Sequence, residues 1–410
     1  MGLQLCQLCE IAYFVTDKIP LENVLLTDYV TTDSLLPNKE GRCVAQNLPP
    51  QKCALTHYKC GDVLVANIRP YLKKIWFADR EGGASADVLV FRAKSGHSQE
   101  FLYASLLQDT FYDYVMKGKK GSKMPRGDRD QIMRYSIPKL SLAEEACIGN
   151  IILSFCTKVN VNRRINDNLE AMAKQLYDYW FVQFDFPNEE GKPYKSSGGA
   201  MVYNERLKRV VPIAWEVENL IDFAEIKNGA TPSTANEANY GGDIVWITPK
   251  DLSDQQSKFV YQGERNITKQ GFDSCSTSML PTNSVLMSSR APIGLVSIAK
   301  HEVCTNQGFK SFIPKSISDS IYLYYYIKHH IKQIEQLGTG TTFKEVSRDD
   351  LCKFPILTIG AKDIYVQWIE LQNGIADKQL ALTKEIAALT KQRDELLPLL
   401  MNGQASINSD

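Results

Sequence analysis

Residues 142–181 read LAEEACIGNIILSFCTKVNVNRRINDNLEAMAKQLYDYWF, a run without proline and with one glycine, Gly149. Its apolar positions recur at steps of three and four residues, which places them along one face of a helix. At about 1.5 Å per residue, the run predicts a helix of roughly 55–60 Å, longer than a globular domain ordinarily needs. The positions that define this face are Ile148, Ile151, Phe155, Val159, Ile165, Leu169, Met172, Leu176 and Trp180.

A second run of the same kind closes the chain, from Lys362 to about Leu400. Neither apolar face can remain in water, and the simplest solution is that the two helices bury each other as a coiled coil. Asn162 lies where the first face calls for an apolar residue. A buried asparagine there would fix the register of the helices, whereas a drifting face would leave it in solvent. The second face consists of Ile364, Trp368, Leu371, Ile375, Leu382, Ile386, Leu389, Arg393, Leu396 and Leu400.

A globular segment precedes each long helix, and the two segments match in order and spacing. Val63-Leu64-Val65 with Arg69-Pro70 echoes Val285-Leu286-Met287 with Arg290-Ala291-Pro292, and the stretch 121–137 matches 340–356 without a gap. A repeat of about two hundred residues is too long for a solenoid, so it predicts a duplicated module and an internal pseudo-twofold repeat. Strands are expected at 63–65, 75–77, 88–91, 135–140, 244–247, 285–287 and 295–298, and helices at 101–116 and 321–336.

We therefore predict an α/β (α+β) chain in which two similar globular modules are separated by two long antiparallel helices that form a coiled coil. Two similar modules on a rigid rod suit a long target with two separated recognition points, and duplex DNA is the natural candidate. The predicted boundaries are 1–141 for the first module, 142–182 for the central helix, 183–211 for a linker, 212–360 for the second module, 361–401 for the distal helix and 402–410 for a flexible tail.

The chain of 410 residues carries 47 Lys and Arg against 47 Asp and Glu, so any surface that attracts nucleic acid must be local. No apolar run is long enough to span a membrane, and the first ten residues lack the features of a signal peptide, so we expect a cytoplasmic protein with free thiols and no membrane partner. A zinc site built from Cys6, Cys9, Cys53, His57 and Cys60 is a weaker alternative, because the gap between its two halves is long.

No catalytic motif is complete in the sequence. The phosphate-binding pattern Gly-x-x-x-x-Gly-Lys-Ser/Thr is absent, and Asn47-Leu48-Pro49-Pro50 has the wrong order for the signature of amino-methyltransferases. Glu225-Ile226-Lys227 could end a metal-nuclease motif, but Asp222 is too near to be its usual partner. We expect a chain that is not an enzyme and holds no cofactor or metal; a nuclease or methyltransferase with an unrecognised motif is the catalytic alternative.

Several segments of the second module and the linker resemble one known family, the specificity (S) subunits of type I restriction-modification systems. The segments are GATPS (229–233), GDIVWITPKDL (242–252), SSRAPIG (288–294), TNQGF (305–309) and GTTF (340–343), and the linker from Trp180-Phe181 to Trp215. The resemblance covers essentially the whole chain. The first module departs in detail, with KKGSK (119–123) where the second has TGTTF (339–343), which leaves the recognised sequence open.

The resemblance implies that each module is a target-recognition domain that reads one half of a split sequence in double-stranded DNA. It implies that the long helices set the spacer and dock two methyltransferase (M) subunits, and that endonuclease/translocase (R) subunits join for restriction. S-adenosylmethionine and ATP with Mg²⁺ would then bind to partner subunits and not to this chain. A two-headed scaffold that binds protein alone, and the specificity subunit of a type IIB-like system, are the alternatives.

Candidate DNA contacts follow from basic and hydrogen-bonding side chains near the repeated motifs. The loop 117–129 carries six basic residues against one acid, Asp128, and could bind phosphates; a solvated loop is the alternative. Arginine can pair with guanine, although surface ion pairs and ordinary turns would also explain such residues. The candidates in the first module are Arg69, Lys73, Lys74, Lys119, Lys120, Ser122, Lys123 and Arg126. Those in the second are Thr231, Ser233, Lys250, Ser289, Arg290, Asn306, Gln307, Lys310, Thr341, Thr342 and Lys344.

Overall fold

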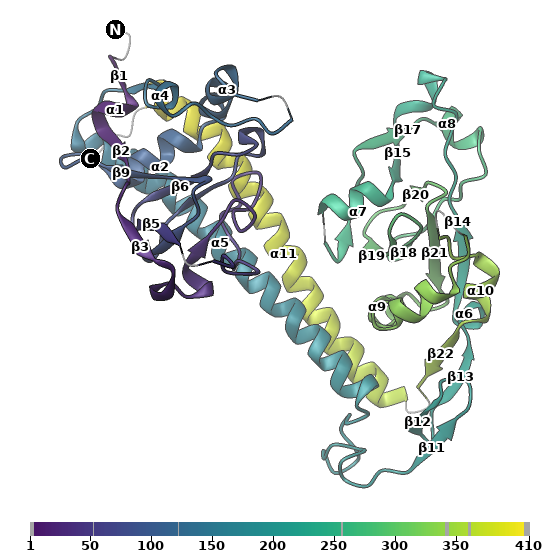
Figure 1. The fold of residues 1–410 in the computed structure, drawn as a ribbon. Helices are drawn as coiled ribbons and strands as arrows, with labels where there is room; N and C mark the ends of the chain where they lie inside the picture. Colours follow the sequence, from purple (N-terminus) through teal and green to yellow (C-terminus); the bar gives the residue numbers. More distant parts are fainter. Residues whose placement is uncertain are drawn as a thin grey trace. The chain divides into compact units, whose positions relative to one another are not determined.

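The computed structural model describes residues 4–51, 53–121, 123–255, 257–340, 344–359 and 362–405. The chain forms two compact units, which are seen in Figure 1. Unit 1 comprises Met1–Asp167 and Gln379–Asp410, and unit 2 comprises Asn168–Lys378. Each unit has its own sheets and hydrophobic core, and the mixture of helices and sheets agrees with the predicted α+β class. Among the described residues, no helix combines the length and apolar character that a membrane span requires.

Unit 1 contains two four-stranded sheets, in the orders β2-β9-β6-β7 and β3-β5-β8-β4, and the pair β1-β10. Its strands are β1 (Leu5–Gln7), β2 (Ala12–Phe14), β3 (Lys18–Pro20), β4 (Tyr29–Val30), β5 (Ala54–Tyr58), β6 (Val63–Ala66), β7 (Ile75–Phe77), β8 (Gly82–Ala84), β9 (Val88–Ala93) and β10 (Ser136–Pro138). Its short helices are α1 (Leu8–Ile11), α2 (Gln99–Leu107), α3 (Asp109–Lys117), α4 (Arg129–Ile132), η1 (Leu21–Asn23), η2 (Leu26–Asp28) and η3 (Pro70–Leu72). The strands expected at 63–65, 75–77 and 88–91 are confirmed as β6, β7 and β9.

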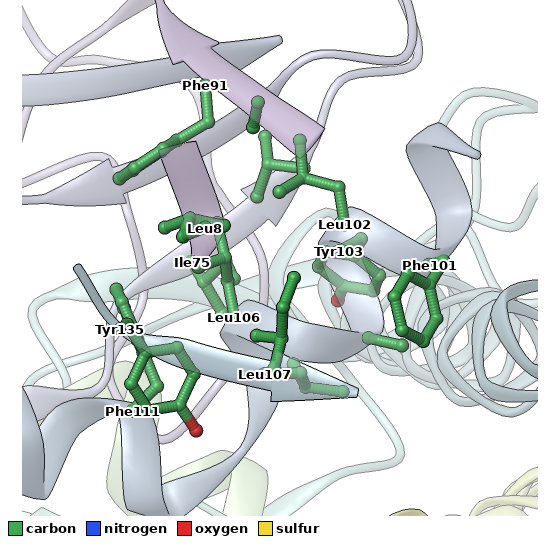
Figure 2. Close-up of a cluster of buried hydrophobic side chains, with 14 of the residues drawn as sticks. Leu8, Ile75, Phe91, Phe101, Leu102, Tyr103, Leu106, Leu107, Phe111 and Tyr135 are labelled. Atoms are coloured by element: carbon green, nitrogen blue, oxygen red, sulfur yellow. The ribbon is translucent and has the colours of Figure 1, made fainter. Parts of the chain in front are cut away.

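The main core of unit 1 forms where α2 packs on the β2-β9-β6-β7 sheet. Figure 2 shows Phe91 of β9 and Ile75 of β7 near the α2 side chains. Residues 101–107 of α2 are all buried, as expected for a helix that is covered on every side. The single helix predicted at 101–116 is wrong: the backbone is extended at Gln108, so α2 ends and α3 begins there.

Unit 2 contains a five-stranded sheet in the order β14-β21-β18-β19-β16, a three-stranded sheet β17-β15-β20, and the pairs β11-β12 and β13-β22. Its strands are β11 (Met201–Asn204), β12 (Arg209–Pro212), β13 (Glu216–Asn219), β14 (Ala224–Asn228), β15 (Tyr240–Ile247), β16 (Phe259–Val260), β17 (Arg265–Ile267), β18 (Val285–Ser289), β19 (Ile293–Ala299), β20 (Cys304–Thr305), β21 (Phe309–Pro314) and β22 (Pro355–Thr358). Its short helices are α6 (Leu220–Phe223), α7 (Pro249–Gln255), α8 (Lys269–Asp273), α9 (Ser320–Leu337), α10 (Arg348–Lys353), η5 (Glu237–Asn239) and η6 (Ile317–Asp319).

The central part of each main sheet has the same antiparallel connectivity. The order β2-β9-β6-β7 in unit 1 corresponds to β14-β21-β18-β19 in unit 2, and every neighbouring pair in both series is antiparallel. The strands that close each module also correspond, since β10 pairs with β1 and β22 pairs with β13. Strand β6 in unit 1 and strand β18 in unit 2 therefore hold equivalent positions, and the residues after them form the candidate sites.

An aromatic cluster forms a core at one end of unit 2. The Phe181 ring lies 4.8 Å from the ring of Trp368 and 5.6 Å from that of Trp215, measured between centroids. Phe186 stacks on Trp215 at 5.0 Å and is buried. The segment 183–211, predicted as a linker of turns and loops, is therefore anchored by buried aromatic side chains and contains the β11-β12 hairpin.

The two long helices are α5 (Leu142–Tyr177), which continues as the π-helical turn η4 (Asp178–Val182), and α11 (Lys362–Met401). In unit 1, Lys158 Nζ lies 3.3 Å from Glu385 Oε1, and Arg393 Nη1 lies 4.0 Å from Cys156 Sγ. Because the later residue of α11 meets the earlier residue of α5, these segments run antiparallel.

The α5 and α11 segments in unit 2 are also in contact. Gln372 Nε2 donates a hydrogen bond to the Ala173 carbonyl oxygen at 2.9 Å, and the rings of Tyr177 and Trp368 lie 6.2 Å apart. Here too the later residue of one helix meets the earlier residue of the other. The side-chain amide of Gln372 is thus buried between the helices, where a purely apolar interface would have a hydrocarbon side chain.

The apolar faces predicted for the long helices are partly wrong. Ile165, Met172 and Leu371 were expected inside but are 39%, 53% and 50% exposed. Of the two alternatives left open for Asn162, the structure has the buried one, since Asn162 is 1% exposed; Ala173 is also buried. The helices contact through small and polar residues along part of their length, so the most apolar face of the sequence is not everywhere the buried one.

Gly149, the one glycine of α5, lies where this helix crosses the start of α2. A methyl group on Gly149 would lie 2.4 Å from the backbone nitrogen of Phe101, so the two backbones would have to separate. We expect Gly149→Ala to lower the free energy of unfolding by about 2 kcal/mol, as overpacking of a core typically does. Urea denaturation followed by circular dichroism measures this change.

Gly374 of α11 provides a matched control for the Gly149 substitution. No atom lies within 4 Å of the position that a methyl group would take there. Gly374→Ala should therefore raise the free energy of unfolding by up to about 1 kcal/mol through helix propensity alone. Equal stability of the Gly149→Ala protein and its parent would contradict the close packing of α5 on α2.

Candidate nucleic-acid interface

The loop between α3 and α4 in unit 1 is held against the segment that follows β6. The backbones of Lys120 and Arg126 exchange two hydrogen bonds, of 2.9 and 3.0 Å, which close the loop. Arg69 N donates to Pro125 O at 2.9 Å, and Gly127 N donates to Asn67 O at 3.3 Å. The structure therefore brings Arg69 together with the lysine-rich loop, although some fifty residues separate them in the sequence.

The basic side chains of this loop are exposed. Within the described part of the chain, Lys119 and Lys123 have no ion-pair partner. Lys120 Nζ lies 2.5 Å from Asp128 Oδ2, and this contact raises the pKa of Lys120 and lowers that of Asp128. Arg126 Nη2 lies 3.1 Å from Asp87 Oδ1. Exposed ion pairs of this kind are weak, so phosphate groups can replace the carboxylates.

Of the residues after Arg69, two lysines have polar partners and one aromatic side chain is exposed. Lys73 Nζ lies 2.8 Å from Asp109 Oδ1, and Lys74 Nζ donates to Thr32 O at 2.6 Å. Both predicted contacts therefore have partners inside unit 1. Tyr71, which was not predicted, is exposed beside Arg69, whose backbone is in the left-handed region at φ 53°. Its place directly after Arg69-Pro70 was the sequence feature that could have added Tyr71 to the candidate contacts.

Unit 2 has a loop that is closed in the same way. Thr339 and Glu345 exchange two backbone hydrogen bonds, of 3.1 and 3.0 Å, and Val346 N donates to Ser289 O at 3.1 Å at the end of β18. Ser347 then caps α10, as Asp128 caps α4 in unit 1. Lys344 lies in this loop and is exposed. The candidates Ser122, Thr341 and Thr342 lie outside the described residues.

The residue that closes each loop differs in charge between the units. Arg126 in unit 1 corresponds to Glu345 in unit 2, and Glu345 accepts a hydrogen bond from Lys310 Nζ at 3.1 Å and lies 3.6 Å from Arg290 Nη1. The Lys310 side chain is 9% exposed. Ser289 is completely buried, and its hydroxyl donates to Gly308 O at 3.2 Å. Ser289 and Lys310, predicted as DNA contacts, thus lie behind the surface and support the loop.

A second loop pair in unit 2 presents hydrogen-bonding side chains. The Thr231 hydroxyl donates to Gln307 Oε1, and the backbone bond from Ala230 N to Thr305 O, 2.9 Å, joins the two loops. Asn306 uses its Oδ1 to accept from Gly308 N, so it shapes its own loop. Because Ser289 N also donates to Gly308 O, at 2.7 Å, this loop pair and the loop 339–345 meet at the end of β18.

The two remaining candidates of unit 2 lie on the surface. Ser233 is exposed and uses its carbonyl oxygen to accept from Asn239 Nδ2 at 3.0 Å. Lys250, in α7, is exposed and lies 2.7 Å from Glu264 Oε2, a contact that raises its pKa. Among these candidates of unit 2, Ser233, Gln307 and Lys344 are therefore exposed, while Thr231 and Arg290 are partly exposed.

The alternative catalytic and metal sites are not assembled in the described residues. Glu225 and Lys227 form an ion pair with each other on β14, and Asp222 accepts a hydrogen bond from Asn219. No group of three or more His, Cys, Asp or Glu side chains in the described part of the chain could hold a metal ion. The described cysteines are free thiols.

Comparison with known proteins gives consistent matches. The sequence model of the family described as "Type I restriction modification DNA specificity domain" matches residues 212–398. The specificity subunit of the type I restriction enzyme HindI from Haemophilus influenzae is 25% identical over an aligned length of 436 residues. The match covers 92% of this chain and 94% of that protein. The MjaIX specificity subunit from Methanocaldococcus jannaschii is 42% identical over 143 residues, which cover 34% of this chain and a third (33%) of that protein.

Among solved structures, the crystal structure of the type I restriction-modification system S subunit from M. genitalium shares this fold. Its TM-score is 0.56 at 10% sequence identity, and the match covers 100% of this chain and 97% of that chain. Residues 212–398 thus match the family of type I restriction modification DNA specificity domains, and the similarity to type I specificity subunits agrees with the resemblance that the sequence motifs indicated.

Proposed function

We propose that each unit of this chain reads one half of a bipartite DNA sequence. The observation that carries the proposal is the pair of loops closed by equivalent backbone hydrogen bonds, at the end of β6 in unit 1 and of β18 in unit 2. Equivalent loops with different side chains suit a protein that uses one framework to recognise two different half-sites. The chain itself would be non-catalytic and would hold no cofactor or metal.

The two loops differ in the contacts that they can make. Lys119, Lys120 and Lys123 suit phosphate groups, which position a protein on DNA but carry no sequence information. Gln307 and Thr231 offer donors and acceptors of the kind that read base edges in the major groove. The Arg69 guanidinium can form two hydrogen bonds with guanine. Each unit would thus combine positioning and reading contacts.

The long helices would provide the second part of the function. We infer that α5 and α11 form a coiled coil that sets the spacer between the half-sites and docks two methyltransferase subunits. The antiparallel contacts inside each unit, such as Gln372 with Ala173, support a helix pair of fixed register. Endonuclease/translocase subunits would join for restriction, and S-adenosylmethionine, ATP and Mg²⁺ would bind to the partner subunits.

A single-molecule map of adenine methylation tests this function. Cells that carry this gene and its methyltransferase partner are compared with cells that lack this gene alone. We expect a split motif that disappears with the gene and that shows both half-sites and their spacing. An unchanged map, with the methyltransferase expressed and active, would refute the proposal. Methylation by the purified chain without partners would refute the non-catalytic assignment.

A further inference from the structure

A cavity of about 490 Å³ lies in unit 2. It is lined by residues 206–209, from the turn of the β11-β12 hairpin and the start of β12, and by His329, His330, Gln333, Gln336 and Leu337 of α9. Tyr177, Tyr326 and Phe354 contribute to its floor. The volume is within the range of small-molecule sites, about 300–1,000 Å³. None of the candidate DNA contacts lines this cavity.

The cavity gathers positive charge without a matching negative charge. Arg206, Lys208 and Arg209 line it, and no Asp or Glu side chain does so among the described residues. Arg206 donates to the side-chain oxygen of Asn219 at 2.8 Å, and Arg209 donates to the carbonyl oxygen of Val182 at 2.6 Å. Both acceptors are neutral, so the hydrogen bonds orient the guanidinium groups but leave their charge uncompensated.

The two histidines of the wall do not add to this charge near neutral pH. Burial and the nearby Arg209 lower the pKa of both His329 and His330, the latter to about 4. The His330 ring stacks on Tyr326 with centroids 4.1 Å apart. The Asp178 carboxylate, which does not line the cavity, opposes this lowering of the His329 pKa, but it forms an ion pair with Lys174. The charge of the cavity therefore comes from its arginine and lysine side chains.

We propose that this cavity binds a phosphate group. Three cations held around one concave surface repel one another, and a multivalent anion relieves that repulsion while accepting their remaining N–H donors. Arginine suits this task because its planar guanidinium can donate two parallel hydrogen bonds to a phosphate. The phosphate could belong to a small phosphorylated molecule or to the DNA backbone. This inference does not depend on the proposed reading of half-sites.

Calorimetric titration of the full-length protein with inorganic pyrophosphate tests the site. We expect a Kd below about 1 mM and a loss of about tenfold or more in the variant Arg206→Gln/Lys208→Gln. The matched control is Lys315→Gln/Lys332→Gln, which removes two exposed lysines of unit 2 that do not line the cavity. Lys208→Gln alone serves as a milder variant, and thermal melting checks the fold of each protein.

Three results would overturn the site. The first is the absence of pyrophosphate binding at several millimolar, and the second is unchanged affinity in both cavity variants. The third is an equal loss in the control, which would show general electrostatic attraction. Repeating the titration with a short DNA duplex present identifies the source of the phosphate. Displacement of pyrophosphate would assign the cavity to the DNA backbone, and independent binding would assign it to a small molecule.

Discussion

Charge reversal of Lys119, Lys120 and Lys123 to glutamate is expected to weaken binding to duplex DNA by about a hundredfold or more at 0.15 M salt. The physical reason is that the loop of unit 1 presents these cations to solvent on a backbone fixed at Lys120 and Arg126. Each phosphate contact releases counterions from the DNA, so lost contacts reduce affinity for every sequence alike. Fluorescence anisotropy with a labelled duplex measures the affinity.

Neutral substitution of the same residues gives a sharper test. If each of the three lysines contacts a phosphate, changing all three to glutamine should reduce the slope of log K against log salt concentration by about 3. Charge reversal of Lys18, Lys59 and Lys139, which are also exposed in unit 1, is the matched control and should change affinity much less. Parental affinity and salt slope in the glutamine variant would show that the loop does not contact DNA.

Helical periodicity predicted the ends of the long helices better than their faces. α5 begins at Leu142 and α11 ends at Met401, close to the predicted limits. The buried face was partly misassigned because the partner helix, rather than apolar content, decides which side is covered. Met172 faces solvent, while Gln372 is fully buried and bonds to the backbone of the facing helix. Such a pairing cannot be read from one helix taken alone.

In the candidate sites too, local features could be predicted from the sequence, whereas contacts between distant segments could not. The match of 121–137 with 340–356 identified both loops, because backbone closure depends on short-range spacing. The roles of Ser289 and Lys310 could not be predicted, since their burial depends on Gly308 and Glu345, which come from other segments. The pairing of Thr231 with Gln307 likewise joins residues that are 76 positions apart. The sequence identified the candidate loops, but it did not separate their exposed side chains from the buried ones that support them.

Substitution of Gln307 by alanine is expected to relax base preference in one half-site and to leave the other half unchanged. Gln307 is exposed at the end of β18, and Thr231 orients its amide. An amide that reads a base edge contributes about 1–3 kcal/mol of discrimination, so the preference at one or two positions should fall about tenfold to a hundredfold. Methylation of duplexes that carry each of the four bases in turn, by the complex with its methyltransferase, measures this change.

The selectivity of the Gln307 effect separates reading from positioning. Lysine substitutions in unit 1 should weaken all sequences equally, whereas Gln307→Ala should change the order of preference among sequences. Gln270→Ala, an exposed glutamine in α8 of the same unit, is the matched control and should leave the preference intact. A uniform loss of methylation at every tested duplex would assign Gln307 to loop structure, because a residue that reads a base must discriminate between bases.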